Sequence, residues 1–294
     1  MDNENKFDVV IVGAGVAGCS LAHALSSSSL RIALLERSLS EPDRIVGELL
    51  QPAGVLALRK LGLEHCLEGI DAIPVKGYCV VETSQDRQVH IPYLPGCEGR
   101  SFHHGRFIMK LRGAAQRAPG VHVIEAVANE LVKKGRKVVG VKAAIGDQAR
   151  VFFADLVIVA DGCFSNFRSS VVPSLSSLTK SHFVGVVLED AKLPYPQHGT
   201  VGLVENSGPV LLYQIGERDT RMLVDVRVPL PADLKVGSIC LASTLSLTYN
   251  HRRTSLQPSY LSYLPPFTIL SRLHWKRIVS GGCQILSCLP STSL

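Results

Sequence analysis

Three glycines near the start of the chain have the spacing that binds a pyrophosphate. Residues 13–18 read GAGVAG and match GxGxxG. In such a run the first glycine turns the chain, the second lets the backbone approach phosphates, and the third lets a helix pack closely on a strand. Glu36 follows at about the 20-residue distance where an acid accepts hydrogen bonds from ribose hydroxyls. The pattern predicts a dinucleotide site formed by Gly13, Gly15, Val16, Ala17, Gly18 and Glu36.

The elements around this run are those that such a site needs. Residues 7–12 are a β-branched run without polar alternation, which predicts a buried parallel strand that ends at the first glycine. Residues 19–25 are small and apolar and predict a helix, whose N-terminus stabilises phosphate charge. Residues 31–35 predict a second strand that leads to Glu36. The fingerprint leaves FAD and NAD open, because both dinucleotides present the same adenosine and pyrophosphate.

Composition and charge indicate a globular protein and argue against nucleic-acid binding. Of the 294 residues, 46% are hydrophobic and 19% are charged, which is typical of a packed chain and not of a disordered one. The formal charge is +6, yet residues 1–235 hold 26 basic and 25 acidic side chains, whereas residues 236–294 hold five basic ones and no acid. The basic excess therefore belongs to the last fifth of the chain and not to a groove-reading domain.

The spacing of the cysteines and the length of the apolar runs exclude further classes of protein. Eight cysteines occur without a CxxC pair or a His/Cys cluster at zinc spacing, so we expect no metal site. The first six residues form a short polar stretch, which predicts that there is no signal peptide. We therefore expect an intracellular chain with reduced thiols. No apolar run approaches the length of about 20 residues that spans a bilayer.

Several longer runs carry a family resemblance. Residues 36–37 read ER, residues 41–52 read EPDRIVGELLQP, residues 102–109 read FHHGRFIM, and residues 159–168 read VADGCFSNFR. In this order they resemble the squalene monooxygenases, also called squalene epoxidases. The last run also resembles the short DG motif of single-component flavin monooxygenases. The resemblance covers residues 7–235.

The resemblance implies an α/β protein, with a glutathione-reductase-like FAD-binding Rossmann fold and an incomplete mixed-sheet substrate region. It implies FAD as the cofactor, with electrons from NADPH delivered by a cytochrome reductase. The implied reaction is the epoxidation of squalene to 2,3-oxidosqualene in sterol (ergosterol) biosynthesis, at the endoplasmic reticulum (microsomal) membrane. In such cofactor chemistry the protein supplies orientation and a dry pocket.

The resemblance also assigns further site residues. Arg44 and Arg112 are expected to bind the pyrophosphate or the polar edge of the flavin, because guanidinium groups bind such oxygens bidentately. Surface ion pairing is the alternative for both. Tyr78, on a strand expected over residues 77–82, is expected near the flavin in a catalytic-site role, with core packing as the alternative. A strand over residues 121–127 is expected to lead to the adenine. The other expected cofactor contacts are Arg37, Leu49, Ala128 and Asp161.

The last fifth of the chain departs from the family pattern. Residues 236–294 hold eleven Ser, eleven Leu and no acid, without the family's second Gly-Asp motif or its apolar C-terminal anchor helices. We therefore expect a FAD-binding monooxygenase region over residues 1–235 and an atypical, poorly packed tail over residues 236–294. Three functions stay open: a complete squalene monooxygenase, a catalytically dead FAD-binding fragment, and an aromatic-ring flavin hydroxylase of the same superfamily.

Overall fold

The computed structural model describes residues 5–45, 47–82, 84–85, 87–171, 180–205 and 208–227. The chain divides into two compact units. Unit 1 consists of Met1–Asp43, Leu56–Ile70 and His104–Ser176, and unit 2 of Arg44–Val55, Asp71–His103 and Ser177–Leu294. Both units draw on the predicted monooxygenase region, and the predicted tail, residues 236–294, lies outside the described residues.

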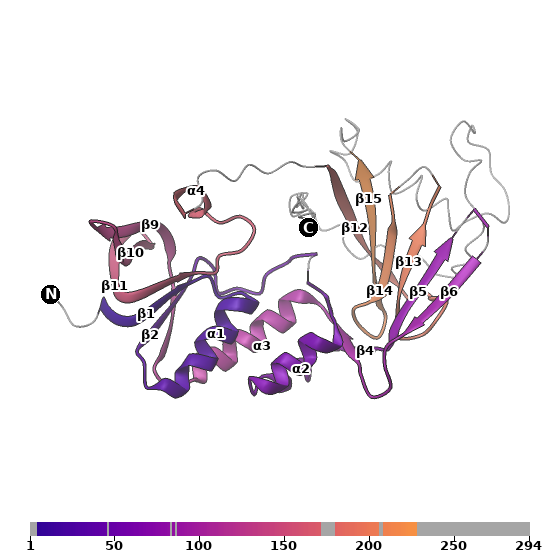
Figure 1. Cartoon of the computed structure of the whole chain (residues 1–294), viewed down its shortest axis with the longest axis horizontal. Coiled ribbons are helices and arrows are strands. Elements are labelled where there is room, and N and C mark those ends of the chain that lie inside the picture. Colours follow the sequence, from indigo (N-terminus) through magenta and orange to yellow (C-terminus); the bar gives the residue numbers. More distant parts are fainter. Residues whose placement is uncertain are drawn as a thin grey trace. The chain divides into compact units, whose positions relative to one another are not determined.

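Unit 1 is built on a six-stranded sheet in the order β8-β2-β1-β11-β10-β9 (Figure 1). The neighbouring strands β8 (Val121–Glu125), β2 (Ile32–Glu36), β1 (Lys6–Val12) and β11 (Gln148–Val159) are parallel. Antiparallel pairs then join β11 to β10 (Lys137–Ile145) and β10 to β9 (Val127–Lys134). The almost fully buried β1 and β2 explain the unbroken apolar runs that predicted them.

Two strands predicted for unit 1 are confirmed, and a third ends earlier than predicted. β1 and β2 match the expected residues 7–12 and 31–35 to within one residue at each end. The strand expected over residues 121–127 breaks at Ala126, whose N–H donates to the Glu36 carbonyl oxygen at 2.8 Å. β8 therefore ends before this residue, and Ala128 lies on the next strand, β9.

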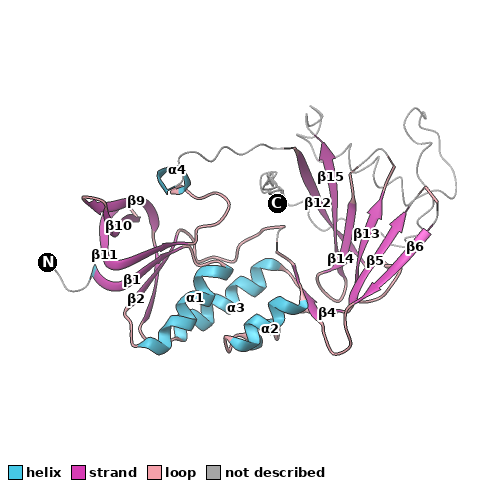
Figure 2. Ribbon diagram, viewed as in Figure 1, coloured by secondary structure: helices cyan, strands magenta, loops and turns pink. Residues whose placement is uncertain are grey.

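The helices of unit 1 pack on one another beside this sheet (Figure 2). α1 (Val16–Leu25) starts directly after the glycine run and leads into the 3-10 turn η2 (Ser26–Ser28), and α3 (His104–Arg117) packs against α1. The other helical segments of unit 1 are η3 (Glu64–Leu67) and α4 (Arg168–Val171), and the residues of α2 (Pro52–Lys60) divide between unit 2 and unit 1. Within the described ranges, no helix has both the length and the hydropathy to cross a membrane.

Unit 2 contains a six-stranded mixed sheet in the order β12-β15-β14-β13-β5-β6. Its strands are β5 (Gly77–Glu82), β6 (Arg87–Pro92), β12 (Ser181–Glu189), β13 (His198–Leu203), β14 (Val210–Gln214) and β15 (Asp219–Arg227). β13 runs parallel to β5, and the other neighbouring pairs are antiparallel. A small sheet of β3 (Leu49–Leu50), β7 (Gly99–Ser101) and β4 (Ile73–Val75) completes the unit. A largely parallel sheet with helices beside it in unit 1 and a mixed sheet in unit 2 confirm the predicted α/β class.

Candidate functional site

The glycine turn joins β1 to α1, and its three glycines differ in what surrounds their Cβ positions. A Cβ on Gly13, which has φ +102°, would lie 2.5 Å from the Ala160 carbonyl oxygen. A Cβ on Gly18 would lie 1.9 Å from the Gly13 carbonyl oxygen, so only glycine lets α1 approach the strand this closely. A Cβ on Gly15 would meet no protein atom within 4 Å. Protein packing therefore explains Gly13 and Gly18, whereas the open space at Gly15 suits a phosphate group.

The start of α1 lies at this open space. Gly15 is the N-cap residue, and no side chain caps the helix or places an acid in its first turn. Val16 is exposed, as is Ala17, whereas Gly13 is buried. The uncapped N–H groups and the helix dipole make such a terminus attractive to anions. Of the five residues predicted for the phosphate site, Gly15, Val16 and Ala17 are thus accessible at the helix start, whereas Gly13 and Gly18 are buried.

Glu36, at the end of β2, hydrogen-bonds to the same turn. Its Oε2 atom accepts from the Ala14 N–H at 2.8 Å, and its Oε1 atom accepts from the Ser38 N–H at 3.3 Å. The carboxylate therefore lies against the glycine turn, where the predicted ribose acceptor belongs. It also holds the turn in place, which is a structural role that the sequence does not reveal.

Arg112 reaches the glycine turn from α3. Its Nε atom donates to the Ala14 carbonyl oxygen at 3.0 Å and its Nη1 atom to the Ser40 carbonyl oxygen at 2.9 Å. Its Nη2 atom lies 3.6 Å from Oε2 of Glu36. The buried guanidinium thus braces the segments that follow β1 and β2, and a direct pyrophosphate contact by Arg112 stays a prediction.

The DG run that follows β11 lies beside the glycine turn. β1 and β11 are parallel, with Val12 opposite Val159, so the residues after both strands leave the sheet at one edge. The Cβ position of Gly13 lies 2.8 Å from the Cα atom of Asp161. The structure therefore brings Asp161 to the predicted phosphate site, although the two motifs are far apart in the sequence.

The other cofactor residues predicted from the resemblance are dispersed. Arg37 is exposed directly after β2. Ala128 is buried in the core of unit 1, opposite Ala143 of β10. Arg44 and Leu49 are half-buried residues of unit 2. The cofactor roles of these four residues stay predictions.

The described residues of segment 44–51, which are 44–45 and 47–51, lie across one face of the unit 2 sheet, and successive residues contact different strands. A Cβ on Gly185 of β12 would lie 2.8 Å from Cγ2 of Ile45, so the glycine provides room for the isoleucine. A Cβ on Gly199 of β13 would lie 3.6 Å from Cδ1 of Leu49. This segment belongs to the run that carries the strongest family resemblance. We call it the strap, because it packs against the strands from β12 to β5.

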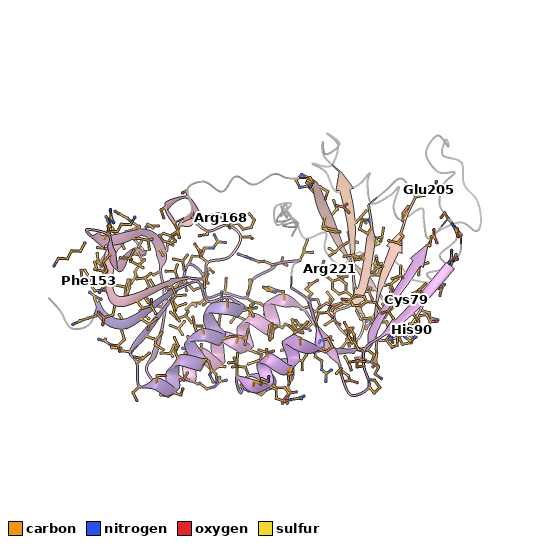
Figure 3. All side chains as sticks on the ribbon, viewed as in Figure 1. Cys79, His90, Phe153, Arg168, Glu205 and Arg221 are labelled. Atoms are coloured by element: carbon orange, nitrogen blue, oxygen red, sulfur yellow. The ribbon has the colours of Figure 1, made fainter. Side chains whose placement is uncertain are left out.

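A buried ion pair fixes the middle of this segment. Oε2 and Oε1 of Glu48 accept from Nε and Nη2 of Arg221, each at 2.8 Å, and the Tyr213 hydroxyl donates to Oε2 at 3.3 Å. The Glu48 and Arg221 side chains are 1% and 8% exposed; Figure 3 marks Arg221 on β15. Burial raises the pKa of Glu48, an effect that the Arg221 hydrogen bonds oppose, and burial also raises the pKa of Tyr213. A carboxylate this deep requires its partner, so the pair holds segment 44–51 on the sheet.

Tyr78 belongs to a second hydrogen-bonded group at the end of the segment. Gln51 donates from Nε2 to the Tyr78 hydroxyl, and the Tyr93 hydroxyl donates to Oε1 of Gln51. The two tyrosine rings meet edge to face with centroids 6.0 Å apart. A Cβ on Gly199 would lie 2.8 Å from Cε1 of Tyr78, so this glycine makes room for the ring. Tyr78 is half-buried, and the hydrogen bond from Gln51 orients its hydroxyl. This arrangement differs from simple core packing. The catalytic-site role of Tyr78 stays a prediction.

An aliphatic row lies next to these polar groups on the same sheet face. Val80 is opposite Val201, Val201 is opposite Leu211, and Leu211 is opposite Leu223. All four side chains are only partly buried. Because Val80 is two residues beyond Tyr78 on β5, it points to the same side of the sheet. The face thus combines an apolar strip with hydrogen-bonded phenols.

The sequence alone did not identify the polar side chains that hydrogen-bond to one another on this face. They are Glu48, Gln51, Tyr213 and Arg221. An available signal was the position of Glu48 and Gln51 inside the run EPDRIVGELLQP, but their partners lie elsewhere in the sequence. Among the described residues, no group of three or more His, Cys, Asp or Glu side chains is arranged to hold a metal ion.

The fold is shared with solved structures that include a FAD-dependent halogenase and a monooxygenase. The myxobacterial chondrochloren halogenase CndH, titled as a variant of FAD-dependent halogenases, superposes with a TM-score of 0.70 at 19% identity, over 83% of this chain and 57% of that chain. The p-nitrophenol 4-monooxygenase PnpA from Pseudomonas putida DLL-E4 gives a TM-score of 0.69 at 14% identity, over 79% and 60%. At these identities the likeness shows the fold alone.

Family models and curated relatives give the family. The model described as Glucose inhibited division protein A matches residues 8–177, and the model described as Squalene epoxidase matches residues 153–239. Squalene epoxidase erg1 of Aspergillus fumigatus is 48% identical over 268 residues, and the squalene monooxygenase of Mus musculus is 45% identical over 237 residues. The chain belongs to the squalene epoxidase family, and its residues 8–177 also match the Glucose inhibited division protein A model.

The extent of these matches adds two facts. The Aspergillus alignment takes in 88% of this chain and 55% of the relative, and the mouse alignment 78% and 41%. The chain thus spans about half the length of the curated relatives it matches. The Aspergillus match is longer than residues 7–235, so the similarity reaches into residues that the motifs alone placed in the atypical tail.

Proposed function

We propose that the chain binds FAD at the glycine turn of unit 1 and takes part in the epoxidation of squalene to 2,3-oxidosqualene. The observation that carries the FAD assignment is the space beside Gly15, where a Cβ would meet no protein atom. The uncapped start of α1 adjoins this space, and the Glu36 carboxylate lies against the same turn. These residues have the chemistry that an adenosine diphosphate group requires: free space and N–H groups for the phosphates and a carboxylate for the ribose hydroxyls.

Bound FAD would supply the redox chemistry and the activation of oxygen. The α1 N-terminus would stabilise the pyrophosphate charge, and Glu36 would accept from the ribose hydroxyls. Arg112 would act as a brace that keeps the Ala14 carbonyl and the Glu36 carboxylate in position. In this assignment Asp161 lies beside the glycine turn, next to Ala160, whose carbonyl oxygen is closer still to Gly13.

The mixed sheet of unit 2 has an apolar surface that suits a hydrocarbon substrate. Squalene has no polar group, so its binding depends on the apolar surface that it removes from water. The strip of Val80, Val201, Leu211 and Leu223 offers partly exposed aliphatic side chains for this purpose. We assign Tyr78 a place at the reaction site, with Gln51 as the residue that orients its hydroxyl.

Electron supply and location extend the same proposal. The relatives named squalene epoxidase and squalene monooxygenase support squalene as the substrate. NADPH would supply the electrons through a cytochrome reductase, and the reaction would take place at the endoplasmic reticulum membrane. These parts rest on the family alone.

Two measurements in sequence test the proposed function. Titrating the purified chain with FAD, followed by the quenching of flavin fluorescence, should show one saturable site, and the Gly15→Val variant should not show it. The chain with FAD, NADPH, a cytochrome reductase and squalene should then form oxidosqualene. Flavin binding without product would reduce the assignment to a catalytically dead FAD-binding fragment. Turnover of a soluble phenol in preference to squalene would favour an aromatic-ring hydroxylase.

A further inference from the structure

Two histidines from distant parts of the chain meet at one edge of the unit 2 sheet. His90 lies on the edge strand β6, where Figure 3 labels it, and His198 opens β13, 108 positions later. Their Nε2 atoms are 2.9 Å apart. Because β5 lies between β6 and β13, the two side chains meet across an intervening strand.

A glycine on the intervening strand makes this meeting possible. His198 is opposite Gly77 of β5, and His90 is opposite Cys79 of the same strand. A Cβ on Gly77 would lie 3.0 Å from Cδ2 of His198. The glycine therefore leaves room for the imidazole of His198 to lie over β5 and reach β6.

Neighbouring groups orient both imidazole rings. Nδ1 of His198 lies 2.8 Å from the Pro196 carbonyl oxygen, so its N–H donates there and its Nε2 atom carries the lone pair. The ring of His90 stacks on that of Tyr195, with centroids 4.7 Å apart and planes 5° from parallel. A backbone carbonyl on the second ring nitrogen is the usual support of a metal-binding histidine.

We infer that His90 and His198 form a two-imidazole site for a transition-metal cation such as Zn²⁺, Ni²⁺ or Cu²⁺. At a metal–N distance of about 2.05 Å, nitrogens separated as these are would subtend an angle of about 90° at the metal, which is the angle between neighbouring ligands in the octahedral and square-planar geometries of Ni²⁺ and Cu²⁺ and is narrower than the tetrahedral angle of Zn²⁺. Imidazole nitrogens suit these three metals. The exposed His90 ring leaves the remaining coordination positions open to water.

The site is exchangeable and not structural. No third His, Cys, Asp or Glu side chain completes a cluster in the part of the chain that the structure describes. A bound cation would nevertheless tie the edge strand β6 to β13, and any ligand that binds only the folded state raises its stability. In the metal-free chain one Nε2 atom donates a hydrogen bond to the other, and the cation takes the place of that proton.

Calorimetric titration of the full chain with NiCl₂, after removal of metal by a chelator, tests the assignment. We expect one equivalent to bind, with an affinity that falls at least tenfold in His90→Gln and in His198→Gln, because each variant removes one of two ligands. His122→Gln changes an exposed histidine of β8 in unit 1 and should leave the affinity unchanged. Circular dichroism verifies that the variants are folded.

Two measurements on the unaltered chain do not depend on the variants. Ni²⁺ should protect His90 and His198 from diethyl pyrocarbonate, as read by peptide mass spectrometry, and should leave the labelling of His122 unchanged. Co²⁺ should bind without a thiolate-to-metal charge-transfer band, which would report cysteine ligands instead. Nickel affinity that survives in the two variants, protection that spares the pair, or a thiolate band would each overturn the assignment.

Discussion

The glycine turn of unit 1 and the strapped sheet face of unit 2 are built in opposite ways. The turn is contiguous: Gly13 to Gly18 and the Glu36 carboxylate belong to one strand-helix-strand stretch, and their contacts are short in sequence. The sheet face is assembled from distant positions, since Glu48 and Arg221 are 173 residues apart and Gln51 and Tyr78 come from different segments. A local motif can thus be recognised from its spacing, whereas a face assembled across strands becomes visible only when the strand order is known.

The two regions also differ in what their polar groups do. In the turn, polar contacts leave space beside Gly15 for a ligand. On the sheet face, the polar groups satisfy one another, and the Glu48–Arg221 pair is almost wholly buried. Substitutions should therefore separate ligand affinity from stability in unit 1 and affect stability first in unit 2.

The largest effect is expected from Arg221→Met. The variant leaves the Glu48 carboxylate buried without its partner, and breaking such a pair costs about 3–5 kcal/mol of unfolding free energy. Urea unfolding followed by circular dichroism measures this loss. The double variant Glu48→Gln with Arg221→Met should recover most of it, because no charge is then left unpaired. A single variant that loses less than 1 kcal/mol would show that the pair does not hold the strap.

The next effect separates two glycines of the same turn. Gly18→Ala should lower the unfolding free energy by about 2–3 kcal/mol, because its Cβ would overlap the Gly13 carbonyl oxygen. Gly15→Val should leave the stability of the ligand-free protein within about 0.5 kcal/mol, since Gly15 has an extended backbone and open space at its Cβ.

The matching readout is FAD affinity in the folded Gly15→Val variant. The valine side chain would occupy the space assigned to the pyrophosphate, so binding should be lost in a titration followed by flavin fluorescence. Retained affinity would remove the phosphate assignment from this turn, and a large loss of stability would make Gly15 a packing glycine like Gly18.

Glu36→Ala has a smaller and mixed effect. Loss of a charged acceptor should weaken FAD by about 1.5–3 kcal/mol. The sequence alone predicts an almost unchanged stability without ligand, but the structure adds the bond from the Ala14 N–H and the nearby Arg112, so we expect a further loss of about 1 kcal/mol in the ligand-free protein. Thermal unfolding with and without FAD distinguishes the two losses, and Glu36→Gln, which keeps an acceptor, is the control.

The smallest effect concerns the thiol of Cys19, which lies on α1 directly after the glycine turn. Burial raises the pKa of Cys19 to about 12, an effect that the charge of Arg112 opposes. At pH 8 iodoacetamide should therefore modify the exposed Cys97 and Cys163 before Cys19, as peptide mass spectrometry can show. An unfolded thiol ionises near pH 8.5, so the unfolding free energy should fall as the pH rises above that value. Early labelling of Cys19 would indicate that α1 opens readily.

The sequence by itself determined the nucleotide half almost completely. The strands β1 and β2 and the packing roles of Gly13 and Gly18 follow from residue type and short spacing, because each is set by contacts within about one strand-helix-strand unit, whereas α1 starts at Val16, three residues before the helix predicted over residues 19–25. The break at Ala126 was missed because the end of β8 is set by its pairing with the distant strand β2, whose last pair is Glu36 with Glu125. Arg112 was found from the resemblance, but its role as a brace was not.

Only the tertiary structure decided the sheet face of unit 2. The order β12-β15-β14-β13-β5-β6 and its registers bring His90 to His198, and the packing of segment 44–51 on this sheet brings Glu48 to Arg221 and Gln51 to Tyr78. A strand's alternating pattern shows which residues share a face, but it carries no information on which strand lies beside it or in which register. Pairing across strands is fixed by the packing of the whole sheet, and for that reason the residues that meet there cannot be derived from local sequence.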